Sequence, residues 1–563
     1  MTIRQAQIGA VVCAAQLLVA ASAFGNNIKV SNVTLTKNTG SSTATVQFDV
    51  AWENSWRVTA GPNNYDAAWV FVKYHTGDLN WKSATLDISN AAHVVPASVA
   101  SAGGTAELKV GKNDAGTRGL GVFIERSAAG SGDVAWHGVK LKWNYSDDAV
   151  LDSSLITLDV HAIEMVYIPQ GAFQVGDGVS RTGASDVASF ITAATPAGTA
   201  PYTVATAGPT AVGPTPAGSL TAAGLAAGSY KAIPTTFPNG FNAYYLMKYE
   251  GSQQQWASFV NTTSKLPALA YTYFESTTNV NQNPEVIDPI NGRQDFFSAD
   301  QPAHINGYYI SPLPATGGVP LPLVPTRPLV QAKYPDRAFV STEADTLAYL
   351  DWSGLRPMTE FEYEKAARGP VAPVQGEYAW GTADVALLTY GAPGNGQLIL
   401  SEDGTPAEAP AVNYNTQGGN AWTRATTLTL TTGVPILGPA RVGMFAKSTY
   451  GAGEAPPRIQ SGSGYYGVMD LTGNLSEMVA KWTFPLAAST TVNFSGEHGD
   501  GLLSATGTQN VTGWTAVAPV TTLFGLRGGS VAEQAIPVSQ RSLITGGTMT
   551  NPGIRGARTA PTP

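Results

Sequence analysis

Two carboxylates seven residues apart frame the segment of this sequence that points most directly to chemistry. Asp470 and Glu477 lie on either side of a Gly473-Asn474 turn. Such a turn exposes backbone carbonyls, and hard cations such as calcium bind about six to eight carboxylate and carbonyl oxygens. The segment is therefore interpreted as a metal-tied loop, and a helix N-cap or a surface turn is the alternative.

The histidines and serines give weaker indications of chemistry. Six histidines occur, none in a His-x3-His pair, and no Gly-x-Ser-x-Gly elbow is present. His498 is the most favourable histidine, because Glu497 and Asp500 lie beside it and could supply a metal ligand or an acid–base pair. The alternative is a Gly-rich loop whose polar groups cap neighbouring backbone.

The N-terminus predicts export. Residues 1–23 have a positive start at Arg4, an apolar run over 8–21 and a small-residue cleavage site at 21–23, which is typical of a signal peptide. A short membrane anchor is the alternative. Cys13 is the only cysteine and lies inside this segment, so the exported chain would carry no thiol. We expect a protein that is secreted, on the cell surface or in the periplasm, without a transmembrane segment.

The amino-acid composition indicates which classes of protein fit this sequence and which do not. The 563 residues carry a net charge of −8, and 13% are charged, against a usual share of about 25%. No basic stripe is available to neutralise phosphates, which argues against nucleic acid as a partner. A low-charge chain with 61 glycines suits an all-β or loop-rich extracellular protein.

The elements that must position these residues fall into two predicted parts. Residues 24–162 show short runs with period-two alternation, separated by turns, and predict a β-sandwich. Residues 163–563 form the second part and contain an Ala/Thr/Gly/Pro-rich insertion at 179–238. The insertion is either a disordered linker or, as Tyr202–Val204 indicates, an ordered β excursion.

Three helices are predicted in the second part. A capping box of Ser252 with Gln255 begins the first, and a second spans about 341–352 and ends at Gly354. Thr359 with Glu362 caps the third, which ends at Gly369-Pro370.

Eight short blocks in the second part occur in an order that resembles the formylglycine-generating-enzyme (sulfatase-modifying factor) superfamily. The blocks are Met165–Gly171, Met247–Glu250, Leu355–Glu360 leading into Ala366–Gly369, Tyr378–Gly381, Arg441–Phe445, Asp470–Glu477, Arg527–Ser530 and Gly553–Arg558. The resemblance implies an α+β chain in which the β-sandwich is followed by a C-type-lectin-like domain with few helices and long loops. It also implies that Glu360 is buried against an arginine.

The resemblance further implies metal sites. One calcium site would use the side chains of Asp470 and Glu477 and the carbonyls of Gly473 and Leu475. A second would begin at Asn413 and Tyr414, but its later acidic ligand has no counterpart between Gln417 and Arg441. Family oxidases hold copper(I) between two cysteines, and the matching positions here are Glu533 and Val538. We therefore expect no copper and no family oxidase activity, because carboxylate and alkyl groups do not replace soft thiolates.

Three functions remain after this loss. The first is a non-catalytic binding or adhesion protein with a protein or glycan ligand. The second is a structural subunit that packs with copies of itself in an extracellular filament or surface layer, and the third is an enzyme of unknown reaction in the ancestral cleft. Loops vary freely on a rigid core. Candidate ligand contacts are Tyr465, Tyr466, Trp482, His498 and Trp514.

Overall fold

The structure is a computed structural model of the chain, and it is mostly β-sheet with four α-helices in its described part. It describes residues 28–38, 40–77, 80–96, 102–178, 189–193, 200–222, 230–263, 306–309, 336, 338–386, 419–421, 439, 441–446, 457–482, 494–515, 523–530, 535–541 and 552–561.

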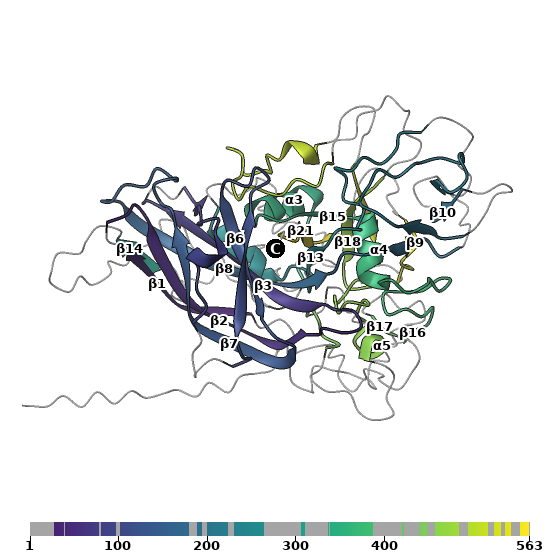
Figure 1. The fold of residues 1–563 in the computed structure, drawn as a ribbon, viewed down its shortest axis with the longest axis horizontal. Helices are drawn as coiled ribbons and strands as arrows, with labels where there is room; N and C mark the ends of the chain where they lie inside the picture. The colour runs from purple at the N-terminus through teal and green to yellow at the C-terminus, as the bar shows by residue number, and fades with distance from the viewer. Residues whose placement is uncertain are drawn as a thin grey trace, which may run out of the picture.

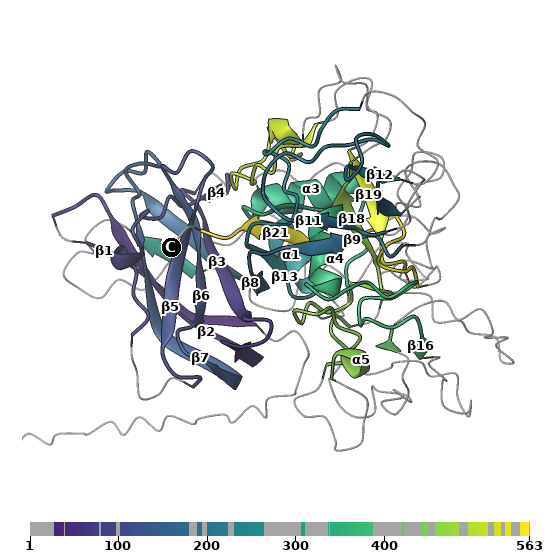
Figure 2. The same ribbon diagram turned by 45° about the vertical axis from the view of Figure 1, so that its right-hand side comes forward.

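The N-terminal strands lie together at one end of the molecule (Figures 1 and 2). Their alternation follows the sequence: in β2 every second residue from Ala44 to Trp52 is buried, as expected for a strand with one face in a core. The strands are β1 (Lys29–Lys37), β2 (Ala44–Arg57), β3 (Tyr65–His75), β4 (Lys82–Ser83), β5 (Ala106–Lys112), β6 (Gly119–Arg126), β7 (Gly130–Trp143) and β8 (Leu155–Ile168), and a 3-10 turn covers Asn90–Ala92.

Strand β3 separates two hydrophobic cores. All eleven of its residues are buried. Val70 and Val72 pack with the apolar faces of β2 and β7, whereas Trp69 and Phe71 pack with the helices of the second part. Because successive side chains in a strand point to opposite faces, one continuous apolar strand serves both cores.

Strand β8 continues the sheet from the N-terminal part into the second part. Its residues from Thr157 to Tyr167 pair with β3, and its end at Met165–Ile168 also pairs with β13 (Tyr244–Met247). The sheet then runs in the order β13, β21 (Gly556–Thr559), β15 (Arg356–Thr359), β18 (Ser476–Ala480) and β19 (Phe524–Arg527). Two further strands join it at its side, β14 (Asn306–Tyr309) on β8 and β20 (Pro552–Gly553) on β18.

Small two-stranded sheets lie in the second part, outside the main sheet. The predicted strand at Tyr202–Val204 is β11, and it pairs with β9 (Phe173–Val175). Strand β10 (Phe190–Thr192) pairs with β12 (Leu220–Ala222). Strand β16 (Val385–Ala386) pairs with β17 (Gly419–Asn420). The described residues of the 179–238 insertion therefore include ordered β structure.

The three predicted helices are present, and their caps explain where they begin. Helix α1 (Gln253–Asn261) follows Ser252, and α4 (Glu360–Arg368) follows Thr359 and ends at Gly369, each with a reciprocal capping box. Helix α3 (Glu343–Trp352) begins two residues later than predicted, because Thr342 is its cap. The remaining elements are α5 (Pro457–Ser461) and a 3-10 turn at Thr512–Trp514.

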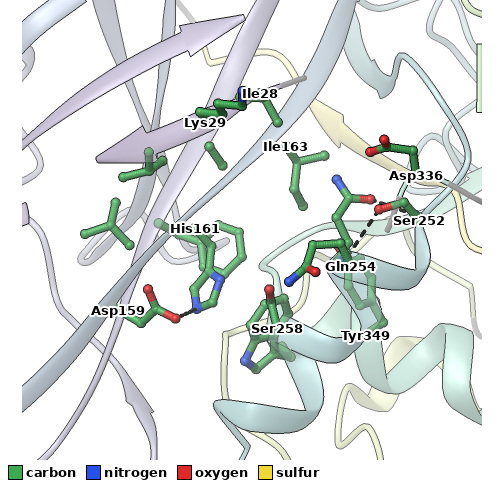
Figure 3. A pocket seen from close by; sticks show the side chains of 16 residues that line it. Ile28, Lys29, Asp159, His161, Ile163, Ser252, Gln254, Ser258, Asp336 and Tyr349 are labelled. Carbon is green, nitrogen blue, oxygen red and sulfur yellow. Dashed lines mark hydrogen bonds and ion pairs between the residues drawn. The ribbon is translucent and has the colours of Figure 1, made fainter. Parts of the chain in front are cut away.

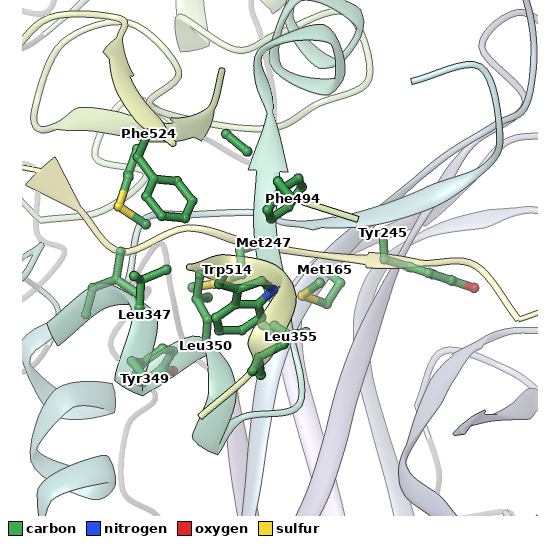
Figure 4. Packing of buried hydrophobic residues seen from close by; sticks show 14 of the residues in the cluster. Met165, Tyr245, Met247, Leu347, Tyr349, Leu350, Leu355, Phe494, Trp514 and Phe524 are labelled. Carbon is green, nitrogen blue, oxygen red and sulfur yellow. The ribbon is translucent and has the colours of Figure 1, made fainter. Parts of the chain in front are cut away.

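The largest core lies where these helices meet the continuous sheet. Figure 4 shows Leu347 and Leu350 of α3 near Leu355 and Trp514, with Met247 of β13 nearby. Within the described residues, no helix has the length and apolar character needed to cross a membrane. The predicted boundary between residues 162 and 163 falls inside β8, and the division into two domains stays a prediction.

Candidate metal-binding turn

The segment from Asp470 to Glu477 forms an irregular turn that leads into β18. Asp470, Gly473 and Asn474 have φ angles of 59°, 86° and 57°. These left-handed values are uncommon for residues with a side chain, so surrounding contacts must hold the turn in place. Glu477 is the second residue of β18, where it pairs with Arg527 of β19 and Gly553 of β20.

The Glu477 carboxylate is fully buried and only partly satisfied. Arg555 Nε donates to Glu477 Oε1 over 2.7 Å, and the Arg555 guanidinium also donates to the carbonyls of Met247 and Met469. Among the residues that the structure describes, Glu477 Oε2 has no hydrogen-bond partner. A buried carboxylate oxygen without a partner is costly and marks a place where another positive group fits.

A third carboxylate, Glu250, holds the turn from behind. Glu250 Oε1 accepts the backbone N–H of Leu475 over 2.9 Å, and Glu250 Oε2 accepts from Asn474 Nδ2 over 2.5 Å. Glu250 is 1% exposed and follows β13, so it connects the turn to the sheet. With the Leu475 N–H engaged in this way, the turn is fixed through its amide groups.

Asp470 is held at the other end of the turn. Its Oδ2 accepts the backbone N–H of Gly443 over 2.7 Å, and the side chain is buried. Gly443 belongs to one of the sequence blocks that resemble the family, so two of these blocks meet at this point.

The electrostatics of the turn favour a cation. Burial raises the pKa of Glu477 to about 7 and raises the pKa of Asp470. Burial also raises the pKa of Glu250 well above its usual value, and the charges of Asp470 and Glu477 raise it further. The carboxylates thus repel one another, while Arg555 opposes the repulsion. A bound cation would relieve the same repulsion.

The ligands that the resemblance implies for this turn are carboxylate and carbonyl oxygens. Among the described residues, no three His, Cys, Asp or Glu side chains converge as a metal cluster. The ligand set implied by the resemblance needs only Asp470 and Glu477 as side chains and takes further oxygens from backbone carbonyls. Oxygen-only coordination of this kind suits a hard cation.

Other residues implied by the resemblance lie elsewhere or outside the described part. Asn413, Tyr414 and Glu533 fall among residues that the structure does not describe. Val538 is 1% exposed and packs in an apolar cluster with Tyr363, and its carbonyl accepts from Arg527 Nη1 over 2.7 Å. The side chain at this position therefore supports packing.

Two of the candidate ligand contacts, Trp482 and Trp514, are core residues. They are 1% and 2% exposed. The Trp482 ring packs edge-on against Phe237, and Trp514 Nε1 donates to the Glu497 carbonyl. The two rings do not face solvent, so they are not placed to stack on a ligand in solution.

Tyr465 and Tyr466 lie where the second part meets the N-terminal strands. Tyr466 is 5% exposed, and its carbonyl accepts from Asn64 Nδ2 over 2.6 Å. Tyr465 is half-buried, with Arg458 5.7 Å from its ring centroid. Of the four aromatic candidates, Tyr465 alone keeps part of its ring accessible.

His498 contacts protein groups on both ring nitrogens. Its Nδ1 lies 2.6 Å from Asp114 Oδ1, and its Nε2 accepts the Thr559 N–H over 3.0 Å. Burial lowers the pKa of His498 to about 4, so the ring is neutral with its proton on Nδ1. The neighbours Glu497 and Asp500 accept backbone N–H groups. This arrangement matches the backbone-capping alternative.

A cavity of about 440 Å³ opens between β1, β8 and the helices α1 and α3 (Figure 3). Asp159 and His161 lie on one side of it, with His161 Nε2 3.6 Å from Asp159 Oδ2. Burial raises the pKa of Asp159 to about 7 and lowers the pKa of His161 to about 3. His161 is packed against Phe71 and Trp352, which limits its freedom to act as an acid or base.

The sequence left the roles of Glu250 and Arg555 unassigned, although both stand in blocks that resemble the family. Glu250 follows the apolar run Tyr244–Met247, which indicates burial but not the partner, and no local pattern marks Arg555 as a partner of Glu477. Comparison with known proteins adds no assignment to this geometry: no family model matches the chain, and no curated protein matches it.

Proposed function

We propose that this protein is a secreted or cell-surface binding or adhesion protein without catalytic activity, built on a formylglycine-generating-enzyme-like domain behind a β-sandwich. The shared core of β2, β3, β7 and β8 supports the sandwich. The small number of helices supports the C-type-lectin-like domain. So does the position of six of the eight sequence blocks, which fall on or beside the neighbouring strands β8, β13, β15, β18, β19 and β21, whereas the Tyr378–Gly381 and Arg441–Phe445 blocks lie outside them.

The observation that carries the proposal is the loss of the copper ligands. Cys13 is the only cysteine in 563 residues, and Val538 stands in an apolar cluster at one of the two matching positions. Copper(I) requires soft ligands, which a buried valine does not supply. The oxidation of a cysteine that the family performs is therefore not expected here.

Calcium is the proposed ion of the turn. Asp470 and Glu477 would bind it through carboxylate oxygens, and Gly473 and Leu475 through carbonyls. The unpartnered, buried Glu477 Oε2 is the main support, because a cation there would satisfy it. When bound, the ion would supply fixed positive charge that ties the loop, and the residues around it would orient that loop. A second calcium at Asn413 and Tyr414 rests on the resemblance alone.

A structural subunit is the second candidate, and strand β1 favours it. Strand β1 (Lys29–Lys37) ends the sheet and, among the described strands, pairs with β2 alone. A strand at the edge of a sheet can add to the sheet of a neighbouring copy. Enzymatic chemistry of another kind would use the cavity beside Asp159 and His161, where ionisable groups with shifted pKa values line a concave surface.

One experiment separates these functions. The purified exported chain is incubated with copper(I) and a sulfatase-derived cysteine peptide, and the peptide mass is followed, with an active family oxidase as positive control. We expect no formylglycine product, and turnover would contradict the proposal.

The same preparation is then tested for partners. A shift of the melting temperature with a glycan or protein ligand, from a chain that sediments as a monomer, supports a binding module. Concentration-dependent assembly supports the structural subunit instead, especially if substitution of Thr34 in β1 by proline prevents it, because proline removes a backbone donor at the sheet edge.

A further inference from the structure

A buried lysine lies in contact with two buried carboxylates where three neighbouring strands meet. Lys248 follows β13, Glu164 lies on β8 and Asp66 lies on β3, and β8 is hydrogen-bonded to both other strands. Lys248 Nζ is 2.9 Å from Glu164 Oε2 and 3.3 Å from Asp66 Oδ2. The three side chains are 4%, 2% and 0% exposed, respectively. An amine and two carboxyl groups are thus held together away from water.

The two carboxylates have different surroundings. Asp66 Oδ1 accepts from Ser55 Oγ over 2.7 Å and from the Trp56 N–H over 3.0 Å, and Asp66 Oδ2 accepts from Trp52 Nε1 over 2.9 Å. Glu164 Oε1, by contrast, has no hydrogen-bond partner within the described part of the chain. Two donors on one carboxyl oxygen are the arrangement that stabilises a developing oxyanion. The Asp66 carboxyl group is therefore suited to be the electrophile that a nucleophile attacks. Glu164 is suited to accept and donate protons.

Aromatic rings enclose the lysine. Lys248 Nζ lies 5.0 Å from the Trp56 ring centroid and 5.2 Å from that of Tyr249. Burial raises the pKa of Glu164 to about 7. Burial lowers the pKa of Lys248, but Glu164, Tyr249 and Asp66 together outweigh this and hold it well above its usual value. The ground state is thus an ion pair, and any reaction must begin with proton transfer from Lys248 to Glu164.

We propose that Lys248 and Asp66 form an intramolecular isopeptide bond, with Glu164 as the proton shuttle. Glu164 takes a proton from the Lys248 ammonium and passes it to Asp66 Oδ2, and the freed amine then attacks Cγ of the protonated carboxyl group. Negative charge develops on Oδ1, where Ser55 Oγ and the Trp56 N–H hold it.

The step balances without an oxidant or a co-reactant. The bond between Lys248 Nζ and Asp66 Cγ forms, and the bond between Cγ and Oδ2 breaks. Two protons from the lysine nitrogen pass by way of Glu164 to Oδ2, which leaves as water, and Glu164 ends in the ionisation state in which it began. The reaction exchanges a buried ion pair, which is expensive to desolvate, for a neutral amide. Contact between the groups replaces a bimolecular encounter.

The bond would join the two halves of the molecule covalently. It connects β3 of the N-terminal strands to β13 of the second part, on either side of β8. A disulfide cannot make this connection, because the chain has a single cysteine. An isopeptide bond would give an extracellular protein without disulfides a cross-link that is resistant to reduction. This inference does not depend on the proposed binding function.

The test is the mass of the purified full chain under denaturing conditions. We expect the wild-type protein to be lighter than its Lys248→Arg variant. The difference should equal the mass difference between arginine and lysine plus the mass of one water. A protease digest should contain a branched peptide that joins the segment around Asp66 to the segment around Lys248. Glu164→Gln should keep the two segments unlinked, whereas Lys73→Arg should leave the branched peptide in place, because Lys73 donates to a hydroxyl and to carbonyls.

Two results would overturn the inference. One is a wild-type protein of full mass whose digest yields both segments as separate linear peptides. The other is a loss of water that maps to a single linear peptide, which would indicate a succinimide. Both readouts use the wild-type chain, so they hold even if a variant fails to fold.

Discussion

At the scale of single residues, the main feature is the buried network of charged side chains that anchors α4. Glu360 is 1% exposed, accepts from Arg527 and Arg541 over 2.8 Å, and also accepts the Trp482 N–H. The resemblance led us to expect Glu360 against an arginine, and this is confirmed. Arg541 lies outside the quoted blocks, and no local pattern around it indicates that a second arginine shares the carboxylate.

Substitution Glu360→Gln should destabilise the fold strongly. It removes the negative charge that compensates two buried guanidinium groups, and breaking a buried pair in this way costs roughly 3 to 5 kcal/mol. The free energy of unfolding in urea measures the loss. Lys37→Gln is the control, because the Lys37–Asp152 pair lies at the surface, where water screens it, and should contribute little to stability. Similar effects of the two substitutions would contradict this account.

His161 should make the fold sensitive to acid. Burial lowers the pKa of His161 to about 3, below its usual value of 6.5. Between these values the unfolded chain binds a proton that the folded chain excludes, so stability falls as the pH drops through this window. By about pH 5 the loss from this group should reach roughly 2 kcal/mol.

The His161→Gln variant measures this loss. Its free energy of unfolding should fall less between neutral pH and pH 5 than that of the wild type. Parallel pH profiles of wild type and His161→Gln would show that His161 does not carry the effect.

At the scale of elements, the capping residues determine how well the first residue of each helix can be predicted. The boxes at Ser252 and Thr359 fixed the starts of α1 and α4 to the residue, because a side chain that bonds its own helix needs no distant partner. The start of α3 was placed at Ser341. Thr342 is the cap instead, and the Ser341 hydroxyl bonds the Pro552 carbonyl, a partner more than 200 residues away that local spacing cannot reveal.

Thr342→Ala should therefore destabilise α3. The Thr342 hydroxyl accepts the Asp345 N–H over 3.1 Å, and loss of such a cap costs about 1 kcal/mol. Thr342→Ser keeps the oxygen and should stay close to the wild type. Thermal unfolding compares the two, and equal losses in both variants would assign the effect to the methyl group rather than to the cap.

At the scale of the whole molecule, the continuous sheet is the feature that the sequence did not predict. The alternation of Leu155–Val160 and the apolar block after Glu164 were assigned to separate parts. They form one strand, β8, because a change of pairing partner from β3 to β13 leaves no mark in the period of a single strand. Side chains also cross this junction: Lys73 Nζ donates to the carbonyls of Trp352 and Gly501.

The two parts should consequently unfold together. With a shared strand and buried hydrogen bonds between them, neither part can open without exposing polar groups of the other. Scanning calorimetry should show a single transition whose calorimetric and van't Hoff enthalpies agree. Two separate transitions would mean that the N-terminal strands fold as an independent unit.

The central claim is that the scaffold has kept a calcium-tied turn after losing its copper ligands. The direct measurement is the melting temperature of the metal-stripped chain, with and without calcium. We expect calcium at a hundredfold excess over its Kd to add about 2.7 kcal/mol of stability. Glu477→Gln should lose most of this response, whereas Glu360→Gln, a buried acid outside the turn, should retain it. Identical melting curves for the wild type with and without calcium would contradict the claim.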